Sequence, residues 1–338
     1  MNPNWRSFLE TAGAVFDSAT PEVLHFGNAA GELQTAQVAT VLVPLTHLGV
    51  IGCSGDDAKS FLHNQLTSDI NHLGAEQSHH TAWCTAKGRM LASFLAWRDA
   101  EAYQLSVAAE LLEPVLKRLR MFVLRAKVTI SDLSASHLLL GLSGPQAGDA
   151  LAAANLPMPA EPLATVAAAG NRVIRLDAER FIICAAAENA GEIWRQLTSI
   201  ARPAGVPAWR WLDVRAGLPL VTGATREEFV PQMADFEKIG GVSFHKGCYP
   251  GQEVVARTQY LGKVKRHLYR VASAPALKAG DELHCPENPD QACGKVVIAA
   301  PSPAGGFEAL AVIQSNFSHD VHLGAKDGPR VEAAAVNP

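Results

Sequence analysis

In the first part of the chain, short apolar runs typical of strands alternate with segments in which apolar residues have helical spacing. Between residues 112 and 123 the apolar side chains recur every three or four positions, which is typical of a helix with one buried face. The other runs are short and rich in β-branched and aromatic residues. The pattern predicts strands at 47–51, 82–97, 103–107 and 127–130 and helices at 57–66 and 112–123.

A second copy of this pattern follows. The sequence Gly52-Cys53-Ser54-Gly55 is matched 89 residues later by Gly141-Leu142-Ser143-Gly144. Each copy links an apolar run to helical spacing, so the Ser-Gly pair predicts a strand-to-helix turn where glycine permits close backbone packing. Further strands are expected at 137–140, 173–176, 180–185 and 209–214, and helices at 146–154 and 193–200. Each half is therefore predicted to be a βαββαβ, ferredoxin-like unit.

The pattern changes after about residue 260. Short apolar runs at 267–272, 294–299 and 309–313 are separated by Gly and Pro, and no long helical period is present. This predicts a small all-β domain, a barrel or a sandwich. The expected fold class is α+β, with two ferredoxin-like domains and a C-terminal β-barrel.

The composition argues against two kinds of partner, nucleic acids and membranes. The 29 Lys and Arg residues stand against 33 Asp and Glu residues, giving a formal charge of -4 over 338 residues. Such a chain has no general basic field for nucleic acid, so we expect no direct nucleic-acid partner. No stretch reaches the roughly 18 apolar residues of a membrane span, and we expect a cytoplasmic protein without a membrane partner.

The six cysteines contain no Cys-x-x-Cys pair and are expected to be free thiols. Cys53, Cys84 and Cys184 lie in apolar runs, where a small buried side chain is the favoured interpretation. The spacing of Cys285 and Cys293 fits no common zinc or cluster pattern, so no metal site is predicted.

Cys248 stands in a different setting. It lies between glycines and next to Pro250, which favours a tight exposed turn. The residues after Gly251 have helical character, and a helix N-terminus together with nearby cations would favour a thiolate. The cations close in sequence are Lys246, Lys263, Lys265 and Arg266. The residues alone leave open the alternative that Cys248 is a simple turn residue and that Lys246 and Arg257 are surface charges.

The segment Lys246–Glu253, KGCYPGQE, resembles the signature of the YgfZ family of folate-binding proteins, which are relatives of the glycine-cleavage T-protein. The resemblance extends over essentially the whole chain. Its further motifs are Phe61–Asp69, Ala86–Met90, Gly141–Ala147, Ala216–Pro219 and Phe229–Gln232.

The resemblance implies a fold of two related α+β domains and a C-terminal β-barrel around a central opening. Tetrahydrofolate or another reduced folate would bind in the middle. The implied domains are residues 46–136, residues 1–45 together with 137–258, and residues 259–338. In this arrangement the N-terminal strands join the second α+β domain.

The resemblance also implies an accessory factor for assembly or repair of iron-sulfur enzymes, including tRNA-modifying ones. Its partners would be folate and iron-sulfur client or assembly proteins. Cys248 would be the working thiol with Lys246 beside it, although one thiol cannot hold a cluster, which needs about four. The residues expected to bind folate are Gln65, Thr67, Asp69, Lys87, Arg89, Tyr249, Gln252 and Arg257.

Two alternatives stay open. One is a tetrahydrofolate-dependent one-carbon transferase; however, Ala92 and Ser93 stand where T-proteins carry two aspartates, and neither can handle a proton at the folate nitrogen. This difference argues against an ordinary aminomethyltransferase. The other is a cysteine hydrolase or redox enzyme pairing Cys248 with His245, but a histidine so close in sequence is more commonly exposed to solvent.

Overall fold

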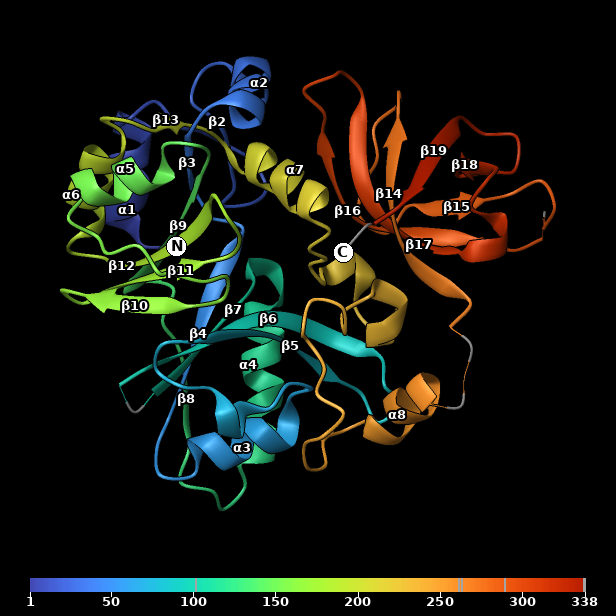
Figure 1. Cartoon of the computed structure of the whole chain (residues 1–338), viewed down its shortest axis with the longest axis horizontal. Coiled ribbons are helices and arrows are strands. Elements are labelled where there is room, and N and C mark those ends of the chain that lie inside the picture. The colour runs from blue at the N-terminus through green and yellow to red at the C-terminus, as the bar shows by residue number, and fades with distance from the viewer. Residues whose placement is uncertain (101, 261, 263, 289, 337–338) are drawn as a thin grey trace. The chain divides into compact units, whose positions relative to one another are not determined.

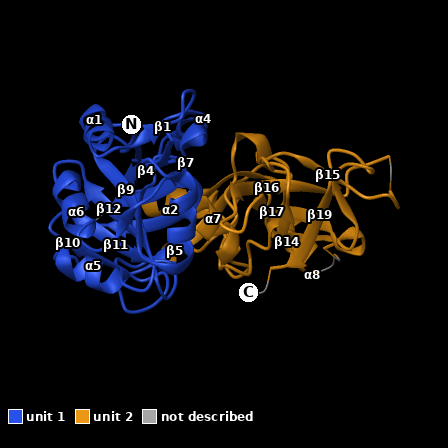
Figure 2. Cartoon of the chain, turned by 90° about the horizontal axis from the view of Figure 1, so that it is seen from above, with its two compact units in different colours: residues 1–58, 72–79, 95–209 blue, residues 59–71, 80–94, 210–338 orange. Residues whose placement is uncertain are grey.

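The chain forms two compact units built from interleaved segments. The computed structural model describes residues 1–100, 102–260, 262, 264–288 and 290–336. One unit comprises residues 1–58, 72–79 and 95–209, and the other comprises residues 59–71, 80–94 and 210–338 (Figure 2). Neither unit is a continuous stretch of sequence.

The region predicted to be the first βαββαβ unit forms a five-stranded sheet with two helices (Figure 1). It has one strand more than predicted, because the run at 82–97 falls on two strands, Ser78–Cys84 and Met90–Asp99. Helix α4 (Ala109–Val123) packs on β4 (Leu48–Ser54) and β8 (Thr129–Asp132). Its buried residues are Leu111, Val115, Leu116 and Leu119, which confirms the helical period. The strands in spatial order are β5 (Ser78–Cys84), β6 (Met90–Asp99), β7 (Ala102–Ala108), β4 (Leu48–Ser54) and β8 (Thr129–Asp132). The helices are α3 (Ala58–Gln65) and α4 (Ala109–Val123).

A six-stranded sheet carries the second copy of the pattern. Strand β3 (Val41–Pro44) from the N-terminal segment pairs antiparallel with β9 (His137–Ser143), so the N-terminal segment contributes to this sheet. Its strands in spatial order are β10 (Thr165–Ala168), β11 (Asn171–Arg175), β12 (Arg180–Ala186), β9 (His137–Ser143), β3 (Val41–Pro44) and β13 (Arg202–Pro203). The other elements of this region are α1 (Pro3–Thr11), β1 (Val15–Phe16), β2 (Val23–His25), α2 (Ala29–Val38), α5 (Ala147–Ala153) and α6 (Ala190–Leu197).

The predicted strand at 209–214 is wrong, because these residues lie in helix α7 (Val206–Ala216). Trp209 and Trp211 are both buried and alternate in the sequence as they would in a strand. Trp211 and Val214 are buried at helical spacing, however, so the helix is covered on more than one side and its period is obscured. Pro207 lies in the first turn, where its missing N–H costs no hydrogen bond.

Each of the two Ser-Gly turns brings its glycine close to the backbone of another segment, as predicted. Gly55 has φ +114°, and a Cβ there would lie 2.2 Å from the carbonyl oxygen of Lys127. Gly144 has φ +130°, and a Cβ there would lie 2.6 Å from the carbonyl oxygen of Ala39. Any side chain at either position would collide with backbone, so both copies of the repeat require glycine for the same reason.

The last part of the chain forms a closed six-stranded barrel, which confirms the all-β prediction and the α+β class with a C-terminal barrel. In order around the barrel the strands are β14 (Arg266–Ser273), β17 (Phe307–Gln314), β16 (Gly294–Pro301), β15 (Glu282–His284), β18 (Val321–Leu323) and β19 (Arg330–Ala335). Pairing of β14 with β19 closes it. In the part of the chain that the structure describes, no helix combines the length and apolar character needed to span a membrane.

We predict that Gly144→Ala lowers the free energy of unfolding by about 3 kcal/mol or more, since it adds a backbone collision to the strain of a positive φ. Gly170→Ala is the matched control: φ is +77° and no atom lies within 4 Å of the added Cβ. It should cost about 1 kcal/mol. Urea titration followed by tryptophan fluorescence measures both, and equal losses would contradict the close approach at Gly144.

Candidate functional site

Cys248 lies in an exposed loop that leads into helix α8 (Gln252–Tyr260), as the sequence predicted. The other five cysteines are buried. Burial raises the pKa of the Cys53, Cys84 and Cys184 thiols to about 12, so these groups stay protonated and inert at neutral pH. Cys248 is therefore the cysteine that a ligand or another protein can reach.

The start of α8 is held by a backbone contact with the turn at residues 85–89. Gly251 has φ +83°, and a Cβ there would lie 2.4 Å from the carbonyl oxygen of Thr85 and 2.7 Å from Cα of Gly88. Gly88 has φ +72°, and a Cβ on it would lie 3.1 Å from Cβ of Val254. Two motifs that are far apart in the sequence thus pack backbone against backbone. The buried Gln232 adds a side-chain bond, because its Nε2 donates to the carbonyl oxygen of Val255 at 2.8 Å.

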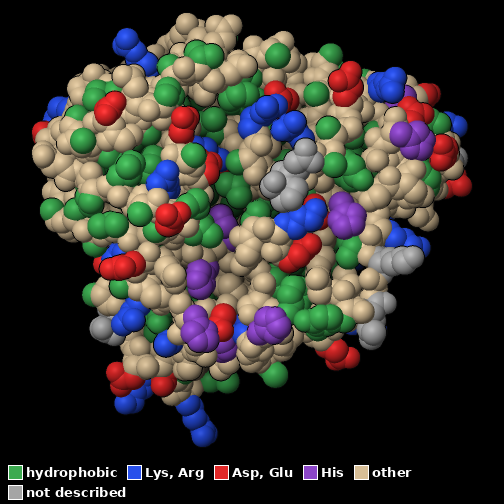
Figure 3. Space-filling view, viewed as in Figure 1, with side chains coloured by type: hydrophobic (Ala, Val, Ile, Leu, Met, Phe, Trp, Pro, Cys, Tyr) green, Lys and Arg blue, Asp and Glu red, His purple; other side chains and the backbone are tan. Residues whose placement is uncertain are grey.

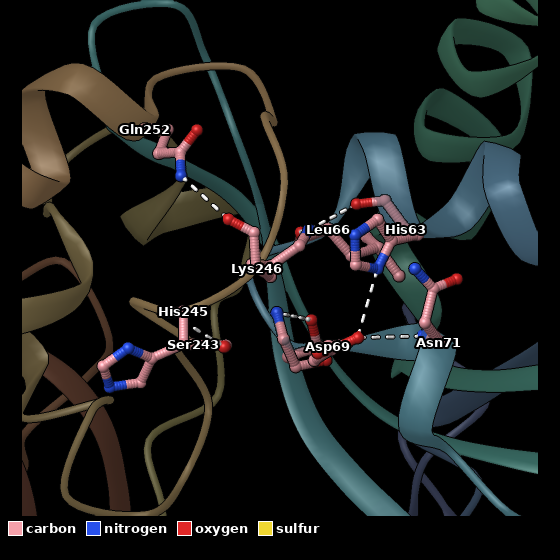
Figure 4. A network of polar contacts seen from close by, with 10 residues as sticks. His63, Leu66, Asp69, Asn71, Ser243, His245, Lys246 and Gln252 are labelled. Carbon is pink, nitrogen blue, oxygen red and sulfur yellow. Dashed lines mark hydrogen bonds and ion pairs between the residues drawn. The ribbon is translucent and has the colours of Figure 1, made fainter.

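The amine of Lys246 anchors the cysteine loop to the end of helix α3. Its Nζ donates to the carbonyl oxygens of His63 and Leu66, the latter at 2.5 Å (Figure 4). It also lies 4.8 Å from the centre of the Tyr249 ring, a cation–π distance. Carbonyls in the last turn of a helix lack intrahelical partners and attract cations. Lys246 therefore completes the end of α3 from a distant part of the chain.

Burial gives Lys246 unusual acidity. Desolvation lowers the pKa of its amine to about 8, while the charges of Asp69 and Cys248 act in the opposite direction. Burial also raises the pKa of Tyr249, with a smaller contribution from Cys84 in the same direction. An amine that exchanges its proton close to neutral pH beside an accessible thiol is typical of functional sites.

His63 is a residue that the sequence reasoning did not select. Its Nδ1 lies 3.3 Å from Oδ1 of Asp69, and its Nε2 lies 3.4 Å from the position that a Cβ on Gly247 would take. The imidazole thus lies close to a carboxylate on one side and to the cysteine loop on the other. His245 instead is exposed, and its ring points away from Lys246 and His63 (Figure 4). The signal that could have identified His63 is its place inside the Phe61–Asp69 motif.

Thr67, Gln65 and Gln252 make internal bonds. The fully buried Thr67 hydroxyl donates to the carbonyl oxygen of Gly241 at 2.6 Å and accepts from the amide of Ala82 at 2.8 Å. Oε1 of Gln65 accepts from the indole N–H of Trp83 at 3.2 Å. Nε2 of Gln252 donates to the carbonyl oxygen of Lys246 at 3.5 Å. Thr67 in particular holds the loop in place and has no free donor for a ligand.

Lys87, Arg89 and Arg257 lie elsewhere in the same unit, around a cavity of about 640 Å³ that we call the basic cavity. The Arg89 guanidinium also donates to the carbonyl oxygen of Glu228. Lys263 lies outside the described residues. The structure thus divides the predicted residues into those around the cysteine loop and those of the basic cavity. The cavity is lined by Lys87, Arg89, Val230, Met233, Val254, Arg257, Thr258, Gly262, Val264, Lys265, Arg266 and Gln314.

Ala92 and Ser93 lie inside strand β6 and are almost fully buried. The Ser93 hydroxyl accepts a hydrogen bond from the amide of Val221 at 2.9 Å. These positions therefore provide packing and a backbone bond, and neither side chain has an ionisable group.

Comparison with known proteins identifies the class. A family model described as the GCVT N-terminal domain matches residues 14–239. The crystal structure of glycine cleavage system aminomethyltransferase T from Bartonella henselae aligns with 100% of this chain and 97% of that chain, with a TM-score of 0.82 and 19% identity. At this identity the likeness concerns the fold. The protein therefore has the fold of the glycine-cleavage T-protein class.

Proteins with similar sequences show which family within this class the chain belongs to. The "tRNA-modifying protein YgfZ" of Shigella sonnei (strain Ss046) is 30% identical over 286 residues, covering 83% of this chain and 87% of that protein. The protein of the same name from Escherichia coli (strain K12) is 29% identical over the same shares. The chain belongs to the YgfZ family within the T-protein-like superfamily, as its KGCYPGQE motif indicated.

We predict that Lys246→Met lowers the free energy of unfolding at pH 7 by about 1–3 kcal/mol, because two helix-end carbonyls lose their donor. Between pH 8 and 10.5 the unfolded lysine holds more protons than the folded one, so this residue makes the wild type more stable as the pH rises. The difference in the free energy of unfolding between the wild type and Lys246→Met should therefore increase from pH 7 to pH 9.5.

The control for this prediction is Lys278→Met, which removes an exposed amine from the barrel. Urea titrations at the two pH values measure all three proteins. If the difference in the free energy of unfolding between the wild type and Lys246→Met is the same at both pH values, the Lys246 amine is not desolvated as we infer.

Proposed function

We propose that this protein is a folate-binding accessory factor in the assembly or repair of iron-sulfur enzymes, including those that modify tRNA. Cys248 is its working thiol. The observation that carries the proposal is the setting of Cys248: it is accessible, whereas the other cysteines are buried, and it lies beside an amine whose pKa is lowered to about 8. The name of the relatives, tRNA-modifying protein, supports the link to tRNA modification.

Two residues with ionisable side chains lie close to the Cys248 loop. Lys246 can hold or release a proton near Cys248, and His63, which lies 3.3 Å from Asp69, is close to the same loop. A single cysteine supplies one cluster ligand where about four are usual. The remaining ligands would come from a second protein or from a second copy of this chain, which the exposed position of Cys248 allows.

The basic cavity suits the anionic end of a reduced folate. Val230, Met233 and Val254 give it apolar walls, and cations from three segments are placed to bind carboxylates. A bound reduced folate would supply ring nitrogens that can accept a one-carbon unit. Because Ala92 and Ser93 cannot move the proton that such a transfer requires, we favour an accessory role over a transferase.

We predict that a chromosomal Cys248→Ala strain loses aconitase activity and tRNA methylthiolation to the level of a complete deletion. Protein abundance and tetrahydrofolate affinity should stay unchanged, because the side chain is exposed and does not line the cavity. Cys53→Ala, which removes a buried thiol, is the matched control and should retain both activities.

The alternatives give different results in the same experiment. Loss of activity only in the deletion would mean that folate binding matters and that the thiol role is wrong. Normal activity in both strains would overturn the iron-sulfur proposal. Aminomethyl transfer by the purified protein would then establish the one-carbon enzyme in its place.

A further inference from the structure

The basic cavity contains more positive charge than the described surroundings neutralise. Its five cations are Lys87, Arg89, Arg257, Lys265 and Arg266. Among the residues that the structure describes, no carboxylate lines it.

Three other cations of the same unit form ion pairs with carboxylates. Lys238 lies 2.9 Å from Asp235, Lys295 lies 3.0 Å from Glu228, and Arg215 lies 3.6 Å from Glu308. Within the described parts of the chain, the cavity cations form no such ion pair. Like charges gathered in a recess repel one another and attract an anion, so the arrangement favours a bound anionic group.

The cations are presented by elements that the fold holds together. Lys87 and Arg89 belong to the turn that packs against α8 through Gly88 and Gly251, and Arg257 comes from α8 itself. Arg266 begins β14 and pairs with Gln314 of β17 in the barrel. Three segments thus converge on one volume, which is the pre-organisation that a binding site needs.

We propose that the basic cavity binds a small polyanion, a flexible chain of at least three carboxylate or phosphate groups. The site shares Lys87, Arg89 and Arg257 with the proposed folate site, so the inference deepens that function. A folate with one glutamate brings two carboxylates, which is fewer than the five cations present. An oligo-γ-glutamyl tail or an oligophosphate supplies the missing charges.

The cavity favours a small ligand over RNA. Its volume of about 640 Å³ lies in the range of small-molecule sites. No aromatic side chain lines it among the described residues, whereas single-stranded nucleic acid is usually bound by aromatic stacking. On the face seen in Figure 3, basic side chains are interspersed with acidic ones and form no broad basic surface.

The test measures binding to the purified full-length chain by isothermal titration calorimetry. The probes are tetrahydrofolate with one glutamate, tetrahydrofolate with five glutamates, inorganic tripolyphosphate and unmodified tRNA. The test variant is Arg257→Gln with Lys265→Gln. Its control, Lys278→Gln with Lys326→Gln, removes the same charge from exposed positions that do not line the cavity.

We expect the five-glutamate folate to bind about tenfold or more tightly than the one-glutamate form. The advantage should weaken with salt. It should be lost in the test variant and kept in the control. Equal binding of the two folates, together with tripolyphosphate binding that only the test variant loses, would identify oligophosphate as the source of the charge.

The remaining outcomes separate this inference from the proposed function. Equal binding of both folates without tripolyphosphate binding would overturn the polyanion site and leave the folate proposal intact. Tripolyphosphate binding without binding of either folate would support the site and overturn the folate proposal. Binding of tRNA alone, lost in the test variant, would overturn the small-ligand inference.

Discussion

The contact between Gly88 and Gly251 determines where both candidate sites lie. A side chain at position 251 would meet the backbone of residues 85 and 88 within 2.4–2.7 Å, so the approach depends on glycine. The cysteine loop runs up to this contact, and α8 with Arg257 runs away from it. Moving the contact by the size of one methyl group would displace the thiol loop and the basic cavity together.

On the loop side of that contact, Lys246 balances two opposing effects. Removing its amine from water favours the neutral form, while two helix-end carbonyls and the nearby negative charges favour the ammonium. The result is a pKa of about 8, close to the pH of a cell. The same bonds that anchor the loop to α3 therefore also set the proton affinity beside Cys248.

Local pattern was enough to predict most elements but not the contacts between them. The period of the apolar residues identified α4 and the barrel strands, and it failed at Trp209 and Trp211, where a helix buried on several sides alternates like a strand. The KGCYPGQE motif located the cysteine loop. It could not show that His63 faces that loop, because this depends on the docking of α3.

The cations of the basic cavity show the same limit of prediction from the sequence. Lys265 and Arg266 attracted attention as neighbours of Cys248 in the sequence, yet the structure places them with Lys87 and Arg89 around a cavity that Cys248 does not line. Helix α8 lies between the cysteine and these residues in the sequence, so their position along the chain does not show that they line a cavity with Lys87 and Arg89. Only the tertiary fold determines which charges act together.

The fold of the T-protein class is preserved in this chain although the sequence differs widely. The likeness to the aminomethyltransferase spans the whole chain at 19% identity, so the backbone is preserved while most side chains differ. At Ser93 the hydroxyl accepts the Val221 amide, a bond that maintains the sheet and carries no charge. The loop before α8 instead carries an exposed thiol, Cys248, and a buried lysine, Lys246.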